Sequence, residues 1–310
     1  MYARGWAACR WVSAYERLHT AVSTGNHAAL RAHIACSTVA LLTFGERARL
    51  LQATIAEDDA YALQALIVAS PCVSVDTLLE GGVTLLGAAI TLFAVSCTRQ
   101  LLKLGANWAC VDVHGYSAVH LAALHNLHNV LRLLLTHRRC ILTLAPPPVW
   151  GVAPRIISVG VSPAFLVDTH AGPQGKTPLA LAIEHATVRS CPASVSLLLE
   201  YGVTVNAPAL DGRTPLHRAV QLNSVPTARE MLHVGALVNA QDMRGNIPLH
   251  SVAYENQAPC ILLLLAHGAD AHAANAFGYT PFAYCLTAYL RHYAAAAASD
   301  QLPLEPRFTR

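Results

Sequence analysis

The sequence is short of charge, of aromatic side chains and of catalytic motifs. Charged residues make up 13% of its 310 residues and aromatic residues 6%, and the formal net charge is only +3. Because Lys and Arg form no dense basic stripe, a nucleic-acid-binding surface is not expected. A nucleophile elbow, an HExxH helix and a paired-carboxylate arrangement are also missing, which argues against an enzyme. Residues 172–177 (GPQGKT) end like a phosphate-binding loop but lack its first glycine.

Metal ligands at ligand spacing are missing as well. The nine cysteines stand singly, with no CxxC pair, so we expect small core side chains rather than disulfide partners or metal ligands. The sixteen histidines include His125 and His128 at i,i+3 on one predicted helix face. No carboxylate or thiol stands nearby to close a tetrahedral zinc site. We therefore expect neither a metal nor another cofactor.

One long uncharged stretch, residues 81–98, is about the length at which a membrane span must be considered. It contains Gly81, Gly82 and Gly87, and we predict a buried helix pair instead. The first twenty residues alternate arginines with aromatic residues and lack the continuous apolar segment of a secretory signal. We expect a cytoplasmic protein, or one that is also nuclear.

A recurring tetrapeptide organises the sequence that is present. Thr214-Pro215-Leu216-His217 has weaker copies at a period near 33 residues. Its threonine position recurs at Thr84, Ser117, Thr177, Thr214, Ile247 and Thr280, with fainter copies at Glu16 and Ala48. The spacing from Ser117 to Thr177 is 60 residues, so about 27 extra residues lie between these copies.

The unit from Asp242 to Ala273 shows the physical reasons for the pattern. Gly245 can adopt a positive φ in a turn, and the Asp242 side chain can bond nearby backbone amides. Ile247 stands where Thr214 offers a hydroxyl as N-cap, so this copy gives up a cap worth about 1 kcal/mol. Pro248 then suits the first helical position.

The second helix of the same unit carries an apolar stripe predicted to be buried by its neighbours. Ile261, Leu264 and Leu265 form the stripe, and Gly268 ends the helix as a left-handed cap. The same ending appears at residues 101–106, 198–202 and 231–236.

The tetrapeptide, the period and the Leu-Leu-x-x-Gly-Ala ending resemble the ankyrin repeat, a β-turn finger followed by two antiparallel helices. The resemblance implies an all-α solenoid of about eight units in a single domain over 1–310, with repeats starting near 13, 45, 79, 112, 172, 209, 242 and 275. It also implies that His19, His120, His217 and His250 bond the backbone of a neighbouring finger. Asn206 and Asn239 take the place of the inter-repeat asparagine. Such a fold usually binds proteins rather than catalysing a reaction, and we expect a monomeric scaffold or adaptor.

The resemblance further implies a concave groove lined by finger tips and by the exposed side of the first helices. The candidate partner-binding residues are His114, Tyr116, His125, Arg213, Gln221, Met243, Arg244, Tyr254, Phe277 and Tyr279. Aromatic, Met and Arg side chains are enriched at interface hot spots, so we place the centre of the site near Arg213, Arg244 and Tyr254. For any one position, an ordinary solvated surface residue is the alternative.

The extra residues, 138–171, are predicted to form a long inserted finger loop. Its prolines forbid a long regular helix, and its apolar groups include Trp150 and Phe165. These groups either pack back on the array or form a protruding binding element.

A tail, residues 294–310, follows the last repeat. Leu302-Pro303-Leu304 loosely resembles part of the SOCS box that follows some ankyrin arrays. The alternative function is therefore a substrate receptor of a cullin-type ubiquitin ligase, with a SOCS-box-like or F-box-like tail and the array binding the target.

Overall fold

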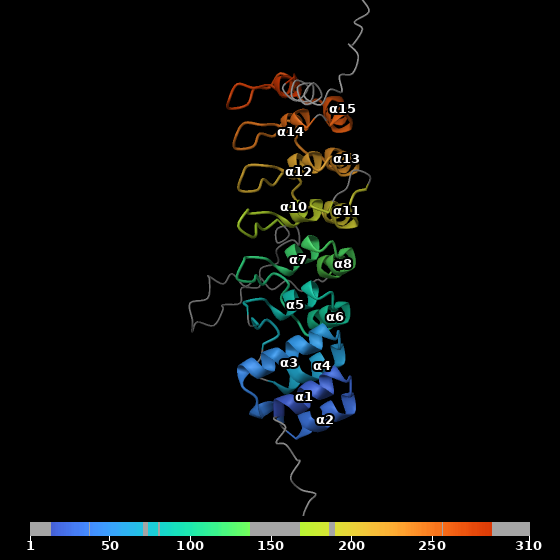
Figure 1. Cartoon of the computed structure of the whole chain (residues 1–310). Coiled ribbons are helices and arrows are strands. Elements are labelled where there is room, and N and C mark those ends of the chain that lie inside the picture. Colours follow the sequence, from blue (N-terminus) through green and yellow to red (C-terminus); the bar gives the residue numbers. More distant parts are fainter. Residues whose placement is uncertain are drawn as a thin grey trace, which may run out of the picture. The chain divides into compact units, whose positions relative to one another are not determined.

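The computed structural model describes residues 14–36, 38–70, 74–79, 81–136, 168–185, 190–255 and 257–286. It divides into two compact units. Unit 1 comprises residues 1–167 and 171–173, and unit 2 comprises residues 168–170 and 174–310. Within each unit the helices are stacked in pairs, and the fingers that precede them project on one side (Figure 1).

Unit 1 is a double layer of helices. Its helices are α1 (Ala14–Ser23), α2 (His27–Ala35), the short 3-10 helix η1 (Thr38–Leu41), α3 (Phe44–Ala56), α4 (Ala60–Ala69), α5 (Leu85–Thr91), α6 (Val95–Lys103), α7 (Ala118–Leu124) and α8 (His128–Thr136). In one layer α1, α3, α5 and α7 pack in succession, and α2, α4, α6 and α8 form the other.

Unit 2 repeats this arrangement. Its helices are α10 (Pro178–Ile183), α11 (Ala193–Glu200), α12 (Pro215–Gln221), α13 (Val225–His233), α14 (Pro248–Tyr254) and α15 (Ala258–Ala266), and residues 281–286 are also helical. Here α10, α12 and α14 pack as one layer and α11, α13 and α15 as the other. The described residues contain no strand, only isolated β-bridges such as Leu78–Thr84 and Val111–Ser117 in unit 1, which confirms the all-α prediction.

The first helices of the repeats at Thr84 and Thr177 begin where the repeated tetrapeptide predicts. The Thr84 side chain accepts from Gly87 N at 2.9 Å, and that of Thr177 from Ala180 N at 3.3 Å. Ile247 precedes α14 without a side-chain cap, as predicted.

The prediction that a helix starts after Ala48, the faint copy of the threonine position, is wrong. α3 begins five residues earlier, after Thr43, whose hydroxyl accepts from Glu46 N at 3.3 Å, while Glu46 Oε2 accepts from Thr43 N at 2.8 Å. This reciprocal capping box stabilises a longer helix of 13 residues, and the tetrapeptide pattern does not include it. Ala48 lies inside that helix and is buried.

Two histidines of the motif tie each first helix to the next finger. His217 Nδ1 accepts from Thr214 N at 3.2 Å, and its Nε2 donates to the carbonyl oxygen of Asn246 at 3.0 Å. His250 bonds Ile247 N and the Tyr279 carbonyl in the same way. These bonds confirm the scaffold role predicted for both residues, whose side chains are almost completely buried.

His19 departs from this pattern. It is exposed, and its ring lies 5.6 Å from that of Tyr15. The difference follows from its place within α1 rather than three residues after a finger.

The inter-repeat asparagines are confirmed. Asn206 Oδ1 accepts from Leu237 N at 2.8 Å, and Asn239 Oδ1 accepts from Asp270 N at 2.9 Å. Asp168 makes the equivalent bond to Thr204 N at 2.8 Å. Residues 168–171, the end of the predicted insertion, are thus tied into the repeats, whereas Trp150 and Phe165 lie outside the described residues.

The apolar stripe predicted on α15 is partly wrong. Leu264 is fully buried, but Leu265 is 42% exposed. The buried pair on this helix is Cys260 and Leu264, spaced i,i+4, and Leu265 is turned about 100° away from that face.

The buried cysteines behave as core side chains. Cys97 and Cys260 are fully buried, and burial raises the pKa of the Cys97 thiol to about 12 and that of Cys260 to about 11. The described cysteines are free thiols, and no helix among the described residues is long and apolar enough to cross a membrane.

Candidate protein-binding groove

An open cavity of about 310 Å³ lies on the finger side of unit 2. It is lined by Arg213, Gln221, Arg244, Asn246, His250, Ser251, Tyr254, Glu255 and Tyr284. We call this cavity the groove. Four of the predicted partner-binding residues, Arg213, Gln221, Arg244 and Tyr254, are among its lining residues.

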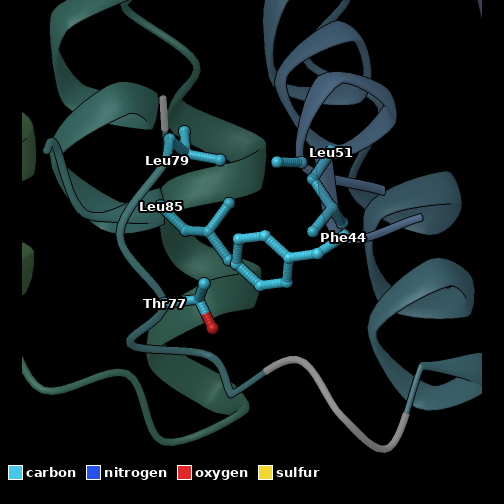
Figure 2. Close-up of a pocket in the computed structure, with 6 residues that line it drawn as sticks. Phe44, Leu51, Thr77, Leu79 and Leu85 are labelled. Carbon is cyan, nitrogen blue, oxygen red and sulfur yellow. The ribbon is translucent and has the colours of Figure 1, made fainter. Parts of the chain in front are cut away.

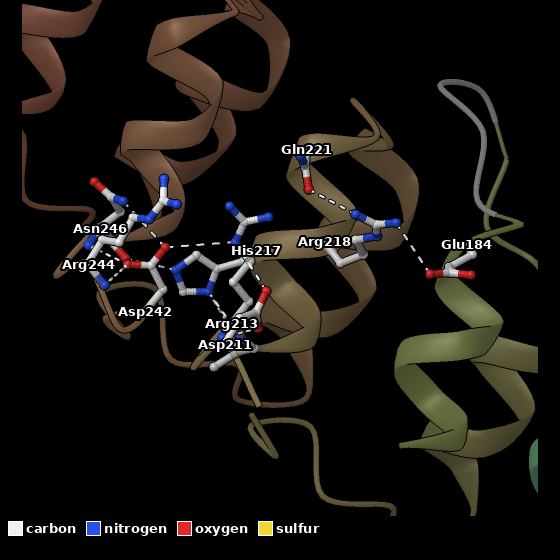
Figure 3. A network of polar contacts seen from close by, with 10 residues as sticks. Glu184, Asp211, Arg213, His217, Arg218, Gln221, Asp242, Arg244 and Asn246 are labelled. Carbon is white, nitrogen blue, oxygen red and sulfur yellow. Dashed lines mark hydrogen bonds and ion pairs between the residues drawn. The ribbon is translucent and has the colours of Figure 1, made fainter. Parts of the chain in front are cut away.

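The finger at Asp242 holds the backbone of Arg244 and the side chain of Arg213. Asp242 is nearly buried, and its Oδ1 accepts from the backbone N–H groups of Arg244 and Asn246, both at 2.8 Å. Its Oδ2 lies 3.8 Å from Arg213 Nε, and the exposed Asp211 lies 3.6 Å from the same nitrogen. Figure 3 shows these charged groups gathered around His217. The finger turn of one repeat thereby positions an arginine of the preceding one.

A second set of charges lies along α10 and α12. Glu184 Oε1 pairs at 3.3 Å with Arg218 Nη2, and Arg218 Nη1 donates to Gln221 at 3.1 Å (Figure 3). Glu184 Oε1 also pairs with Lys176. Lys176 and Arg218 therefore have partners within the chain.

Aromatic rings form the C-terminal wall of the groove. The Tyr284 ring lies 6.0 Å from Tyr254, 5.8 Å from Tyr279 and 5.8 Å from His250. Asn275 Nδ2 donates to the Tyr284 hydroxyl at 3.1 Å. Tyr254 is about half exposed, so this wall offers apolar area to a ligand, whereas the predicted residue Tyr279 contacts Tyr284 but does not line the groove.

Exposed apolar side chains continue from the groove onto the fingers of unit 2. Met243 is 76% exposed, Phe277 66% and Leu210 61%. The predicted residues Met243 and Phe277 are therefore accessible, but they stand on the fingers outside the groove lining.

The candidates in unit 1 are not gathered into one site. His114 is exposed in its finger, Tyr116 packs over Gly172, and His125 stacks edge-on against Phe93 at 5.5 Å. Among the described residues, no group of three potential metal ligands occurs.

A narrow apolar gap does occur in unit 1, lined by Phe44, Ala48, Leu51, Thr77, Leu79 and Leu85. Figure 2 shows the Phe44 ring between Leu85 and Leu51. The gap has no room for a water molecule and is a packing feature rather than a ligand site.

The sequence reading missed Ser251 and Tyr284 as groove residues. Both stand four residues after the threonine position of their repeats, as Arg218 does after Thr214. This position, at a spacing of 33, could have identified them, because it falls one helical turn into the first helix on the groove side.

Comparison with known proteins agrees with the repeat pattern. Residues 156–242 match the family model for three copies of the ankyrin repeat, and residues 244–276 match that for a single ankyrin repeat. The chain is similar to the crystal structure of the ankyrin repeat domain of Bcl-3, described as a unique member of the IkappaB protein family. That match has a TM-score of 0.60 and 27% identity over 74% of this chain and 91% of the other.

This chain is an ankyrin-repeat protein. A curated relative is the nuclear factor NF-kappa-B p105 subunit of Gallus gallus, 36% identical over 131 residues. The match covers 39% of this chain but only 13% of that protein. The ankyrin fold is a protein-interaction fold, so the chain contains a protein-interaction repeat domain. The tail at 294–310 lies outside the described residues, and the ubiquitin-ligase role stays a prediction.

Proposed function

We propose that this ankyrin-repeat protein is a non-catalytic scaffold or adaptor whose protein partner binds in the groove of unit 2. The observation that carries the proposal is the gathering of Arg213, Arg244 and Tyr254 on one open cavity. Arginine and tyrosine are over-represented among residues that dominate binding energy at protein interfaces. We further propose that it acts as a monomer in the cytoplasm or nucleus.

Affinity purification from cells with mass spectrometry tests the groove. The bait is the full chain, compared with an Arg213→Ala, Arg244→Ala, Tyr254→Ala variant. The expected result is loss of a partner that the parent protein enriches. The matched control replaces three exposed residues of the second helices, Glu200, Arg229 and Leu262, with alanine and should retain that partner.

The partner set decides between the candidates. If both variants recover the partners of the parent protein, the groove is not the binding site. Recovery of elongin or cullin subunits would instead favour the ligase receptor. Circular dichroism of all three proteins must first show equal helicity.

A further inference from the structure

Some charged side chains of the groove have partners among the described residues and others do not, which indicates the chemistry of the partner proposed above. Three charged residues line it: Arg213, Arg244 and Glu255. Glu255 already accepts a hydrogen bond from Gln257 Nε2. The lining thus offers two cations and one anion that is already hydrogen-bonded.

Arg213 uses only part of its guanidinium group within the chain. Its Nε lies 3.6 Å from Asp211 and 3.8 Å from Asp242, both longer than a good charged hydrogen bond. Its two terminal nitrogens make no ion pair or hydrogen bond with a described residue. Because the guanidinium is a planar fork, these nitrogens can bind a further carboxylate in bidentate fashion.

The Arg244 side chain makes fewer polar contacts with the described residues than that of Arg213. Its backbone N–H donates to Asp242, but its exposed side chain has no ion pair among the described residues. Asp242 cannot serve it well, since its Oδ1 already accepts two backbone N–H groups. By contrast, Arg218 and Lys176 share Glu184. The unused donors of this surface are therefore concentrated on Arg213 and Arg244.

Beside the two arginines and the exposed carboxylate of Asp211 stand exposed apolar and aromatic side chains. Tyr254 lies in the same groove at 46% exposure, and Met243, directly before Arg244, is 76% exposed. A ligand that neutralises the arginines can therefore bury apolar side chains beside them. Purely ionic ligands would leave that area uncovered.

We propose that the groove of unit 2 selects an extended acidic segment of its protein partner. Two carboxylates of the segment bind Arg213 and Arg244, and a neighbouring apolar side chain packs on Met243 and Tyr254. Arg213 and Arg244 stand on consecutive fingers, and residues i and i+2 of an extended chain point to the same side. The segment therefore carries an acidic-x-acidic pattern next to a large apolar residue. This inference rests on the groove being the binding site.

Selection from a displayed library of random 12-residue peptides on the immobilised full chain tests the chemistry directly. The expected outcome is enrichment of peptides with two acidic residues at i,i+2 beside Leu, Met, Phe or Trp. A synthetic peptide of that pattern should bind at least about tenfold more weakly to Arg244→Glu, because each charged hydrogen bond contributes more than 1.4 kcal/mol. Its affinity should also fall with added salt.

Two further proteins complete the experiment. Arg229→Glu, an exposed arginine on α13 outside the groove, should bind the peptide as the parent chain does. Arg213→Gln with Arg244→Gln guards against misfolding caused by charge reversal and should also lose binding. Enrichment of basic or uncharged peptides, or of none, overturns the acidic assignment, as does unchanged binding by Arg244→Glu. If the affinity purification still shows partner loss, the groove survives as the binding site and only the acidic assignment falls.

Discussion

The carboxylate of Asp58 caps a helix of the following repeat. α6 begins after Ala94, which offers no side-chain cap, and Cys97 N donates to Asp58 Oδ1 at 2.8 Å while Ser96 N donates to Oδ2 at 3.2 Å. Burial raises the pKa of Asp58, but these hydrogen bonds outweigh it and hold the pKa below its usual value. Asp58 also has φ +50°, which aspartate and asparagine tolerate better than most residues.

We expect Asp58→Ala to lower the free energy of unfolding by about 1 kcal/mol at pH 7, the cost of a lost cap. Because the folded pKa lies below 3.8, the cap contributes fully above that pH and is lost as the pH falls through the folded pKa. Urea titrations at pH 7 and pH 3 measure this. Asp58→Asn keeps an acceptor oxygen and should lose less, and an alanine variant as stable as the parent protein would contradict the cap.

His217 also loses its contribution to stability as the pH falls, but it does so at a higher pH than Asp58. Burial lowers its pKa below 6.5, so the folded chain binds a proton more weakly than the unfolded chain. The contribution of the His217 ring to the free energy of unfolding is therefore fully present above pH 6.5, and it decreases as the pH drops below that value. We expect His217→Gln to lose about 1 to 3 kcal/mol at pH 7.5 and to show a smaller further loss at pH 5.5 than the parent chain.

Urea titrations at the two pH values measure both quantities. His233→Gln, at an exposed residue of α13, is the control and should keep the pH dependence of the parent chain. An unchanged pH dependence in His217→Gln would contradict the role of the buried ring.

At the scale of elements, the fingers of unit 2 are joined by one backbone bond per step. Met243 N donates to Asp211 O at 3.1 Å, and Ala276 N to Arg244 O at 3.0 Å. Gly245 makes this approach possible. It has φ +72°, and a Cβ there would lie 2.8 Å from Ala276 N, which is backbone and cannot turn aside.

We expect Gly245→Ala to destabilise unit 2 more than Gly268→Ala. Gly268 also has a positive φ, +84°, but nothing lies within 4 Å of its added Cβ, so it carries only the left-handed penalty of about 1 to 2 kcal/mol. Gly245→Ala adds a backbone clash and should speed hydrogen exchange at Ala276. Equal losses in the two variants would show that the finger contact contributes nothing.

The sequence was sufficient to predict the fold because each step of the repeat has a local cause. Thr177 and Thr214 stand directly before first helices, and Asn206 marks an inter-repeat bond. The start of α3 was missed because its capping box at Thr43 is a different local solution from the tetrapeptide. Leu265 was misassigned because its burial depends on how α15 packs, which the helical period alone does not determine.

The groove was predictable only in outline. Arg213, Arg244 and Tyr254 could be placed on one face from their repeat positions. The sequence could not tell which arginines are neutralised, since the pairing of Glu184 with Arg218 joins residues 34 positions apart. That pairing neutralises Arg218, whereas Arg213 and Arg244 keep unused donors.

At the scale of the molecule, repeats that contact only their neighbours should lose stability locally. Leu264 is fully buried in α15, which packs against α13 and α14. Leu264→Ala should cost about 2 to 5 kcal/mol, because a cavity remains where the side chain was. We expect faster hydrogen exchange in α13, α14 and α15, with protection in α5 to α8 of unit 1 unchanged, measured by mass spectrometry.

Leu262 provides the control for this prediction on the same helix. It is 68% exposed, so Leu262→Ala removes the same atoms without opening a cavity and should leave exchange in α13 to α15 nearly unchanged. A loss of protection spread evenly over both units in Leu264→Ala would mean that the array unfolds as one cooperative body. If the loss is confined to unit 2, binding of the acidic peptide should weaken only in proportion to the fraction of unit 2 that is unfolded.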